Sequence, residues 1–324
     1  MNCYVSLIVV CLIGFFSVSC STQGIDDLRQ VSINYQAPEN YQQHRSQQKY
    51  FQSKDGSIAY TDHGKGNVLV LLHGVPTSSW MYRKIIPSLQ NKFRVISVDF
   101  LGYGSSDKPK DNGVNYTPIS QAEKVKNLLT MLDVGKFTLL MHDMGGLVAW
   151  ELLRQSPQSI NSLIVLNTIV HDKGFNQPNI KPGFMAEQLS KAYTNKLTSS
   201  AILELTFDNL GLDGEYKLSE KECFGYVKPL REGDDDALYS FFNNIDDDLL
   251  SRLDSNQHVF EKYKGDTLVL WGGKDKTLTI EQIPFLQEHL NIPETNIHIY
   301  SENNHFLVEE IPKEVILKIT EFMK

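Results

Sequence analysis

Residues 68–73 read VLVLLH, an almost uninterrupted apolar run of the kind that a strand covered on both faces requires. Comparable runs follow later in the chain, and helical patterns separate most of them. This alternation predicts an α/β fold with a mostly parallel sheet and helices on both faces. The expected strands are 50–53, 57–62, 68–73, 93–99, 137–142, 162–167, 267–271 and 297–300, which makes eight. The expected helices are 80–89, 120–132, 145–155, 280–289 and 312–323.

The alternation breaks after residue 167, and the next convincing buried strand begins about a hundred residues later, at 267. A structureless loop of that length is improbable inside a compact domain. Short helical patterns at 185–193 and 201–209 occupy part of the interval. We therefore expect a helical cap at 170–258, inserted after the sixth strand, and a core made of 49–169 and 259–324.

The 324-residue chain is 41% hydrophobic and carries a formal net charge of -8. This length can bury a full core, and one large domain with an insertion accounts for it. Without a basic stripe the chain has nothing to displace counterions from a phosphate backbone, which argues against nucleic acid as a partner.

Residues 1–20 differ from the rest, because 4–18 is almost wholly apolar while 21–48 is polar and rich in glutamine. The apolar run is shorter than the roughly 20 residues of a spanning helix and fits a signal peptide. It ends in SVSC, similar to a bacterial lipobox, so Cys20 is a candidate for lipidation. Plain secretion and an uncleaved anchor are the alternatives. The expected protein is exported, as a periplasmic or cell-envelope lipoprotein attached to the membrane by its N-terminus.

Three of the four cysteines, Cys3, Cys11 and Cys20, lie in this first segment. Cleavage and lipidation would leave only Cys223 in the mature chain, so no internal disulfide is expected. Stability must then come from packing.

The strongest local signal is MHDMGG at 141–146, where a buried strand passes directly into a helix. The two glycines allow a sharp turn, and the residue at its apex, Asp143, would project above the sheet. A carboxylate there can attack an alkyl carbon and form an ester, which divides one hard displacement into two easier steps. The alternative is an aspartate that simply caps the helix N-terminus.

The motif HGVP at 73–76 directly follows the most apolar strand. The backbone N–H groups of Val75 and Met144 would meet there and stabilise negative charge on a carboxyl oxygen of Asp143. A plain strand-ending turn is the competing interpretation.

Two further residues fall at the ends of later strands. His305, in SENNHF at 301–306, could take a proton from water, and the resulting hydroxide would attack an ester on Asp143. Asp275, in WGGKD at 271–275, could accept the ring N–H of His305 and hold its tautomer. Either residue alone could be a surface or turn residue, but the order nucleophile, acid, histidine is the one that this kind of triad requires.

Together these segments resemble the haloalkane dehalogenases and the related epoxide hydrolases of the α/β-hydrolase superfamily. The resemblance rests on 73–89, 95–109, 142–146, 271–276 and 303–312, and it covers roughly residues 49–324. It implies a triad of Asp143, Asp275 and His305 that needs no cofactor and no metal. Asn167 stands where some relatives carry the acid, and an amide cannot serve in that role.

The chain departs from the dehalogenases around the leaving group. They usually hold the halide with a tryptophan directly after the nucleophile and with a second residue, which is either asparagine or glutamate directly after His-Gly or a tryptophan in the cap. This chain has Met144 after the expected nucleophile and Val75 after His-Gly. Related epoxide hydrolases protonate the leaving oxygen with cap tyrosines. The candidates here are Tyr193, Tyr216, Tyr226 and Tyr239.

The sequence therefore predicts a hydrolase that forms a covalent ester on Asp143, with a small apolar electrophile and water as its partners. A haloalkane is the substrate that the resemblance favours, and an epoxide is the alternative. A third alternative, from another class, is an exported binding protein that keeps the fold without turnover.

Overall fold

The computed structural model describes residues 37–324 except 111–112, 177–179, 234, 245–251 and 254. The predicted signal peptide and Cys20 lie outside these residues. None of the helices in the described part of the chain combines the length and the apolar character needed to cross a bilayer.

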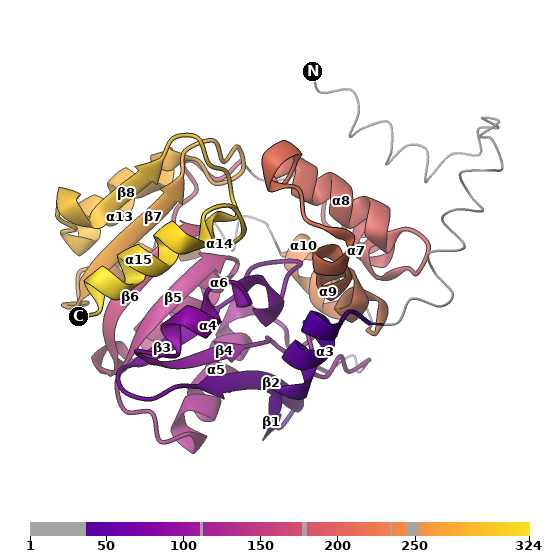
Figure 1. The fold of residues 1–324 in the computed structure, drawn as a ribbon, viewed down its shortest axis with the longest axis horizontal. Coiled ribbons are helices and arrows are strands. Elements are labelled where there is room, and N and C mark those ends of the chain that lie inside the picture. The colour runs from indigo at the N-terminus through magenta and orange to yellow at the C-terminus, as the bar shows by residue number, and fades with distance from the viewer. Residues whose placement is uncertain (1–36, 111–112, 177–179, 234, 245–251, 254) are drawn as a thin grey trace. The chain divides into compact units, whose positions relative to one another are not determined.

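An eight-stranded sheet forms the centre of the fold (Figure 1), in the order β1-β2-β4-β3-β5-β6-β7-β8. The β1–β2 and β2–β4 pairs are antiparallel, and all other pairs are parallel. The predicted hairpin and the mostly parallel sheet are thus confirmed. The strands are β1 (Lys49–Ser53), β2 (Gly56–His63), β3 (Val68–Leu72), β4 (Arg94–Val98), β5 (Phe137–Asp143), β6 (Ile160–Thr168), β7 (Asp266–Gly272) and β8 (Ile297–Tyr300).

Burial follows the apolar runs. Every residue of β5 is buried, as are the last four of β3, so these neighbouring strands form the middle of the core. Helices cover the sheet. They are α3 (Glu39–Ser46), α4 (Ile86–Leu89), α5 (Pro118–Met131), α6 (Gly145–Gln155), α12 (Asn256–Phe260), α13 (Ile283–Leu290), α14 (Leu307–Glu310) and α15 (Pro312–Phe322), and short 3-10 turns η1 (Ser79–Tyr82), η2 (Pro157–Ser159), η4 (Ile280–Gln282) and η5 (Glu294–Asn296) adjoin them.

The prediction of one continuous helix over 80–89 is wrong. The structure has η1 and the short α4 there, with Pro87 in the first turn of α4. Proline has no backbone N–H to donate to the preceding turn, so a helix cannot run through this position unbroken.

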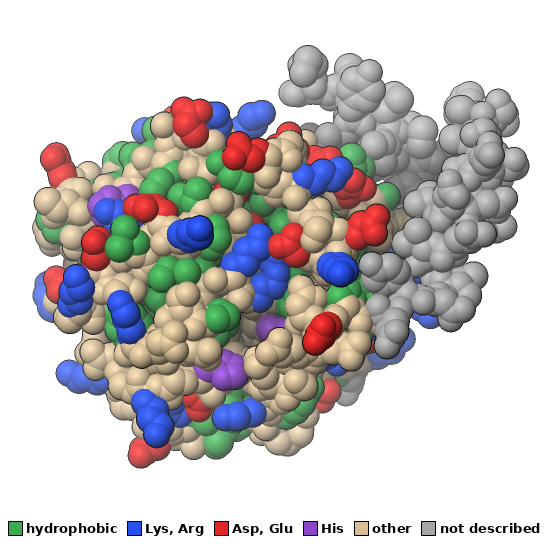
Figure 2. Space-filling model, in the orientation of Figure 1, with side chains coloured by type: hydrophobic (Ala, Val, Ile, Leu, Met, Phe, Trp, Pro, Cys, Tyr) green, Lys and Arg blue, Asp and Glu red, His purple; other side chains and the backbone are tan. Residues whose placement is uncertain are grey.

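Between β6 and β7 the chain forms the helical cap that was expected after the sixth strand. Its elements are α7 (Phe184–Thr194), α8 (Ser199–Asn209), η3 (Gly214–Tyr216), α9 (Glu220–Arg231) and α10 (Asp236–Asn243). In Figure 1 these helices gather at one end of the sheet, and acidic and basic side chains are interspersed over the face shown in Figure 2.

Candidate active site

Asp143 sits at the turn between β5 and α6, in a backbone conformation that side chains rarely adopt, with φ of 52°. The turn is tight on both sides. A Cβ on Gly145 would lie 2.5 Å from the carbonyl oxygen of Leu72, and one on Gly146 would lie 2.1 Å from Oγ1 of Thr168. Glycine is therefore required at both positions, and the turn keeps Asp143 strained at the end of its strand.

The two carboxyl oxygens of Asp143 have different surroundings. Oδ1 accepts a hydrogen bond of 2.8 Å from the backbone N–H of Val75. Burial raises the pKa of this carboxyl, while His305 and the N–H groups of Val75 and Met144 favour the charged form and partly offset that rise. The two predicted backbone donors thus both act on Asp143.

His305 connects the two carboxylates. Its Nδ1 lies 2.7 Å from Oδ2 of Asp275, and its Nε2 lies 3.7 Å from Oδ2 of Asp143. The first distance is that of a strong hydrogen bond, and the second is too long for one, so His305 makes no hydrogen bond to Oδ2 of Asp143. The structure brings the three residues of the predicted triad together.

Charges around His305 set its protonation. Burial alone would lower its pKa, but Asp275 and Asp143 outweigh burial and raise the pKa above the usual value. Burial would raise the pKa of Asp275, yet His305 and hydrogen bonds from Leu278 and Asn167 hold that pKa below its usual value. Asp275 therefore stays ionised and favours the tautomer of His305 with the proton on Nδ1.

The model of the alpha/beta hydrolase fold family matches residues 67–312. The chain belongs to this family. A relative over most of the length is the cis-3-alkyl-4-alkyloxetan-2-one decarboxylase of Shewanella oneidensis, 27% identical over 291 residues that cover 85% of this chain and 88% of the relative.

Two further comparisons connect this α/β-hydrolase with known proteins. Haloalkane dehalogenase 2 of Mycobacterium bovis is 28% identical over 170 residues, 48% of this chain and 59% of the relative. The crystal structure of an α/β hydrolase from Nostoc sp. superposes with a TM-score of 0.73 and 23% identity, and covers 86% of this chain and 97% of that one.

Asn167 has a place in this α/β-hydrolase that sequence reasoning missed. It lies at the end of β6, fully buried, and its Nδ2 donates to Oδ2 of Asp275 at 2.8 Å. Its Oδ1 accepts the N–H of Gly272 at 2.8 Å. The side-chain amide of Asn167, at the end of β6, therefore binds the carboxylate of Asp275. The strand-end position was visible in the sequence, but its partner was not.

Three of the four candidate cap tyrosines have hydrogen-bond partners in the structure. Tyr193 pairs with Oγ1 of Thr206 at 2.6 Å, Tyr226 hydrogen-bonds to Glu309, and Tyr216 accepts from Nδ2 of Asn303 at 3.2 Å. Tyr239 lies half-buried in α10. Three of the four hydroxyls are thus already engaged with other side chains.

Two other tyrosines, from the core, interact electrostatically with Asp143. Burial contributes most to raising the pKa of Tyr82 and Tyr103, and the charge of Asp143 raises both pKa values further. The hydroxyl of Tyr82 donates to the carbonyl oxygen of Leu72 at 2.7 Å. The hydroxyl of Tyr103 lies 4.0 Å from the sulfur of Met144 and donates to the carbonyl of Ala237 in α10 at 3.2 Å. Tyr103 therefore lies between the nucleophile turn and the cap.

All three indole N–H groups of the chain are occupied. Trp80 donates to the carbonyl of Glu222 at 3.0 Å, Trp150 to that of Ile169 at 2.8 Å, and Trp271 to that of Leu278 at 3.0 Å. None is left to hold a halide. Within the described residues there is also no group of three or more His, Cys, Asp or Glu side chains arranged to hold a metal ion.

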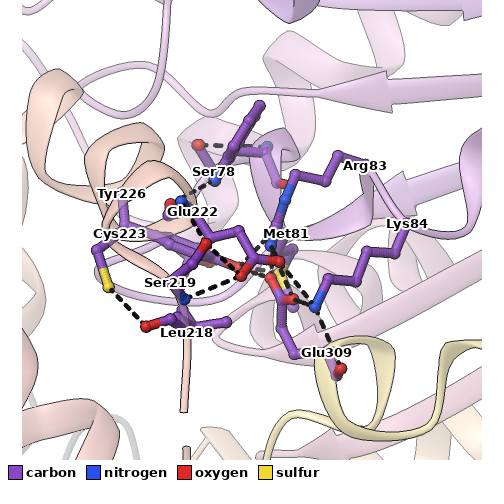
Figure 3. Close-up of polar contacts among 12 residues, drawn as sticks. Ser78, Met81, Arg83, Lys84, Leu218, Ser219, Glu222, Cys223, Tyr226 and Glu309 are labelled. Carbon is purple, nitrogen blue, oxygen red and sulfur yellow. Dashed lines mark hydrogen bonds and ion pairs between the residues drawn. The ribbon is translucent and has the colours of Figure 1, made fainter. Parts of the chain in front are cut away.

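A partly buried charge cluster joins the cap to the core (Figure 3). It consists of Arg83, Lys84, Glu222, Tyr226 and Glu309, and we call it the cap latch. Arg83 bonds Glu222 of α9 at 2.8 Å and Glu309 of α14 at 2.9 Å, and Tyr226 also bonds Glu309. Arg83 stacks over Trp80, 4.7 Å from the ring centroid. The latch fixes α9 beside α14, which directly follows the loop of His305.

Proposed function

We propose that this α/β-hydrolase acts through a covalent ester on Asp143. The observation that carries the proposal is the arrangement of its two oxygens, because Oδ1 is bound by the N–H of Val75 while Oδ2 faces His305 without a hydrogen bond. Oδ2 attacks an electrophilic carbon, and the bond from that carbon to the leaving group breaks as the leaving group takes the electron pair.

Water completes the cycle. His305 accepts a proton from water through Nε2, and the hydroxide adds to the carboxyl carbon of the ester. Negative charge develops on Oδ1, where the N–H groups of Val75 and Met144 stabilise it. The intermediate collapses as the alkoxide leaves with the proton from His305, and Asp143 then loses the hydroxyl proton to solvent and returns to the carboxylate.

We propose that the substrate is a strained oxygen ring rather than a haloalkane. The occupied indoles, together with Val75 and Met144, leave a departing halide without the usual donors. A ring substrate keeps its leaving oxygen attached. The relative matched over 85% of the chain is named for an oxetan-2-one, and an epoxide is the other member of this class.

An oxetan-2-one allows a different second step. Oδ2 attacks the saturated ring carbon that is bonded to the ring oxygen. This breaks the bond between that carbon and the ring oxygen and leaves a free carboxylate on the substrate. Loss of CO₂ then breaks the adjacent C–C bond, whose electron pair forms an alkene as the bond to Oδ2 breaks. Asp143 is regenerated without water, so product analysis separates decarboxylation from hydrolysis.

The proposal is tested by trapping the intermediate. The His305→Gln variant is incubated with 1-bromoalkanes, terminal epoxides and cis-dialkyl oxetan-2-ones, and the peptide that carries Asp143 is analysed by mass spectrometry. We expect an adduct with at least one cyclic substrate and none in the Asp143→Asn control. If no electrophile leaves an adduct and no oxetan-2-one is converted to an alkene, the protein is better described as a binding protein with this fold.

We also propose that the protein is exported and lipidated at Cys20, a residue outside the described structure. Full-length protein expressed in a bacterium should fractionate with membranes, and Cys20→Ala should release it from them. Equal membrane fractions for both forms would rule out the lipid anchor.

A further inference from the structure

The loop that carries His305 spans residues 301–306, between β8 and α14, and we call it the histidine loop. The ends of the sheet strands pack closely against this loop. A Cβ on Gly272, at the end of β7, would lie 1.6 Å from the carbonyl oxygen of Asn304. His142 adds a bond from Nε2 to the carbonyl oxygen of His305, at 2.9 Å.

The cap touches the loop from the other side. The N–H of His305 points to the carbonyl oxygen of Leu210 at 3.4 Å, and a Cβ on Gly211 would lie 2.1 Å from the side chain of Asn304. Backbone contacts thus enclose the loop, but none of them pairs the N–H groups of Asn304 and Phe306, the residues on either side of His305.

Glu310 binds those two groups. Its Oε2 accepts the N–H of Asn304 at 2.8 Å, and its Oε1 accepts the N–H of Phe306 at 3.0 Å. Oε2 also accepts from Nδ2 of Asn303 at 3.2 Å. Glu310 is buried, and three donors converge on it. Only a carboxylate can accept at both ends without presenting a donor of its own, so glutamine at this position would face an N–H with an NH₂ group.

We propose that Glu310 is a positioning residue that holds His305 in place for hydrolysis of the ester on Asp143. The inference rests on the proposed function for its kinetic consequence only. Attack by Asp143 needs no base, whereas activation of water needs His305 within hydrogen-bonding reach, and misplacement of a base by about 1 Å can cost roughly 100-fold in rate. Loss of Glu310 should therefore slow the second step and spare the first.

Four ionisable groups face His305: Asp143 from the nucleophile turn, Asp275 from the loop after β7, His142 from β5, and Glu310 from α14. Glu310 is one of the groups that raise the pKa of His305. Removing its charge should lower that pKa in the free enzyme, without any substrate present. This readout does not depend on which electrophile the enzyme uses.

The experiment compares Glu310→Gln with Glu302→Gln. Glu302 lies in the same loop and is 78% exposed in its side chain, and among the described residues it bonds Lys274 and Ser301 alone, so its variant removes one charge without releasing the loop backbone. NMR titration of the His305 ring is measured in both free proteins, and the alkylated fraction of Asp143 is followed after mixing with a substrate that labels His305→Gln. Glu310→Asp, which keeps the carboxylate, serves as the rescue variant.

We expect Glu310→Gln alone to lower the His305 midpoint and to accumulate the Asp143 adduct, with hydrolysis slowed roughly 10- to 100-fold. Glu310→Asp should recover part of that rate. An unchanged titration of His305 would overturn the positioning role, and so would equal slowing of both half-reactions. If His305→Gln forms no adduct and converts no oxetan-2-one to an alkene, the proposed function fails, and the titration alone decides the role of Glu310.

Discussion

Met144, directly after Asp143, is the residue where the chain departs most from the dehalogenases that it resembles. Its side chain is 6% exposed and lies beside the hydroxyl of Tyr103. Met144→Trp would place an indole N–H next to the nucleophile, and one donor at such a site is worth roughly 100-fold in rate. We expect faster bromide release from bromoalkanes.

Met144→Phe is the matched control, because it supplies an aromatic ring without a donor. A gain that appears equally in Met144→Phe would mean that pocket shape limits the reaction, and the argument from the missing indole would be wrong. Halide release measured over a series of chain lengths decides between the two causes.

Asn167 connects the acid to the sheet through hydrogen bonds to Asp275 and to the backbone N–H and carbonyl of Gly272. Asn167→Leu keeps most of the volume but removes these bonds in a fully buried place, while Asp275 keeps its bond to His305. We expect a loss of about 1–3 kcal/mol in the free energy of unfolding, measured in urea. Asp275 would also orient His305 less well, so ester hydrolysis should slow while alkylation does not. Unchanged hydrolysis would show that Asp275 needs no help from β6.

At the scale of elements, the cap latch is the main polar link between α9 and the core. Glu309 has no exposed side-chain surface, so Arg83→Met leaves a buried carboxylate with Lys84 as its remaining cation. Breaking a buried pair in this way costs about 3–5 kcal/mol. We expect Arg83→Met to unfold at a lower urea concentration than the parent and to be cleaved faster by protease within the cap.

An exposed cap pair provides the comparison. Lys217 and Glu204 form an ion pair with side chains 58% and 59% exposed, and Lys217→Met should leave the free energy of unfolding nearly unchanged. If both variants lose the same amount, the latch contributes no more than a surface contact.

The core strands were predictable from the sequence because each is an apolar run in a fixed rhythm. Elements whose formation depends on packing were less visible. No helix was predicted at α3 or at the four-residue α14, and Pro87 divided a segment that apolar spacing alone predicted as one helix. Within the cap, α9 had a local signal, the capping box of Ser219 and Glu222, which apolar periodicity does not detect.

For the molecule as a whole, parallel topology explains why the candidate site was easier to predict than its surroundings. The ends of parallel strands meet at one edge, so chain order alone predicted that Asp143, Asp275 and His305 lie together. The partners of Asn167 and Arg83 come from segments up to 226 positions away, and no local pattern encodes such pairings. The cap tyrosines illustrate the same limit, since residue type could not tell which hydroxyls were already engaged.

Acid should act on the whole molecule through the cap latch rather than through Asp143 or Glu310. Burial would raise the pKa of Glu222, but bonds from Ser219, Lys84 and Arg83 outweigh it and lower that pKa to about 2. An unfolded glutamate titrates near about 4.3. Glu222 therefore stabilises the fold fully above that value, and its contribution is lost as the pH falls toward 2.

Asp143 and Glu310 have the opposite sign, because burial raises their pKa values and protonation then favours the folded state as the pH falls. We expect the free energy of unfolding to decline between about pH 4.3 and about pH 2, and Glu222→Gln to flatten that decline. Urea unfolding across this window measures both curves, with Glu204→Gln as the exposed control. Parallel curves for Glu222→Gln and the parent would mean that the acid sensitivity arises elsewhere, with Asp275 as the next carboxylate to test because its pKa is also lowered.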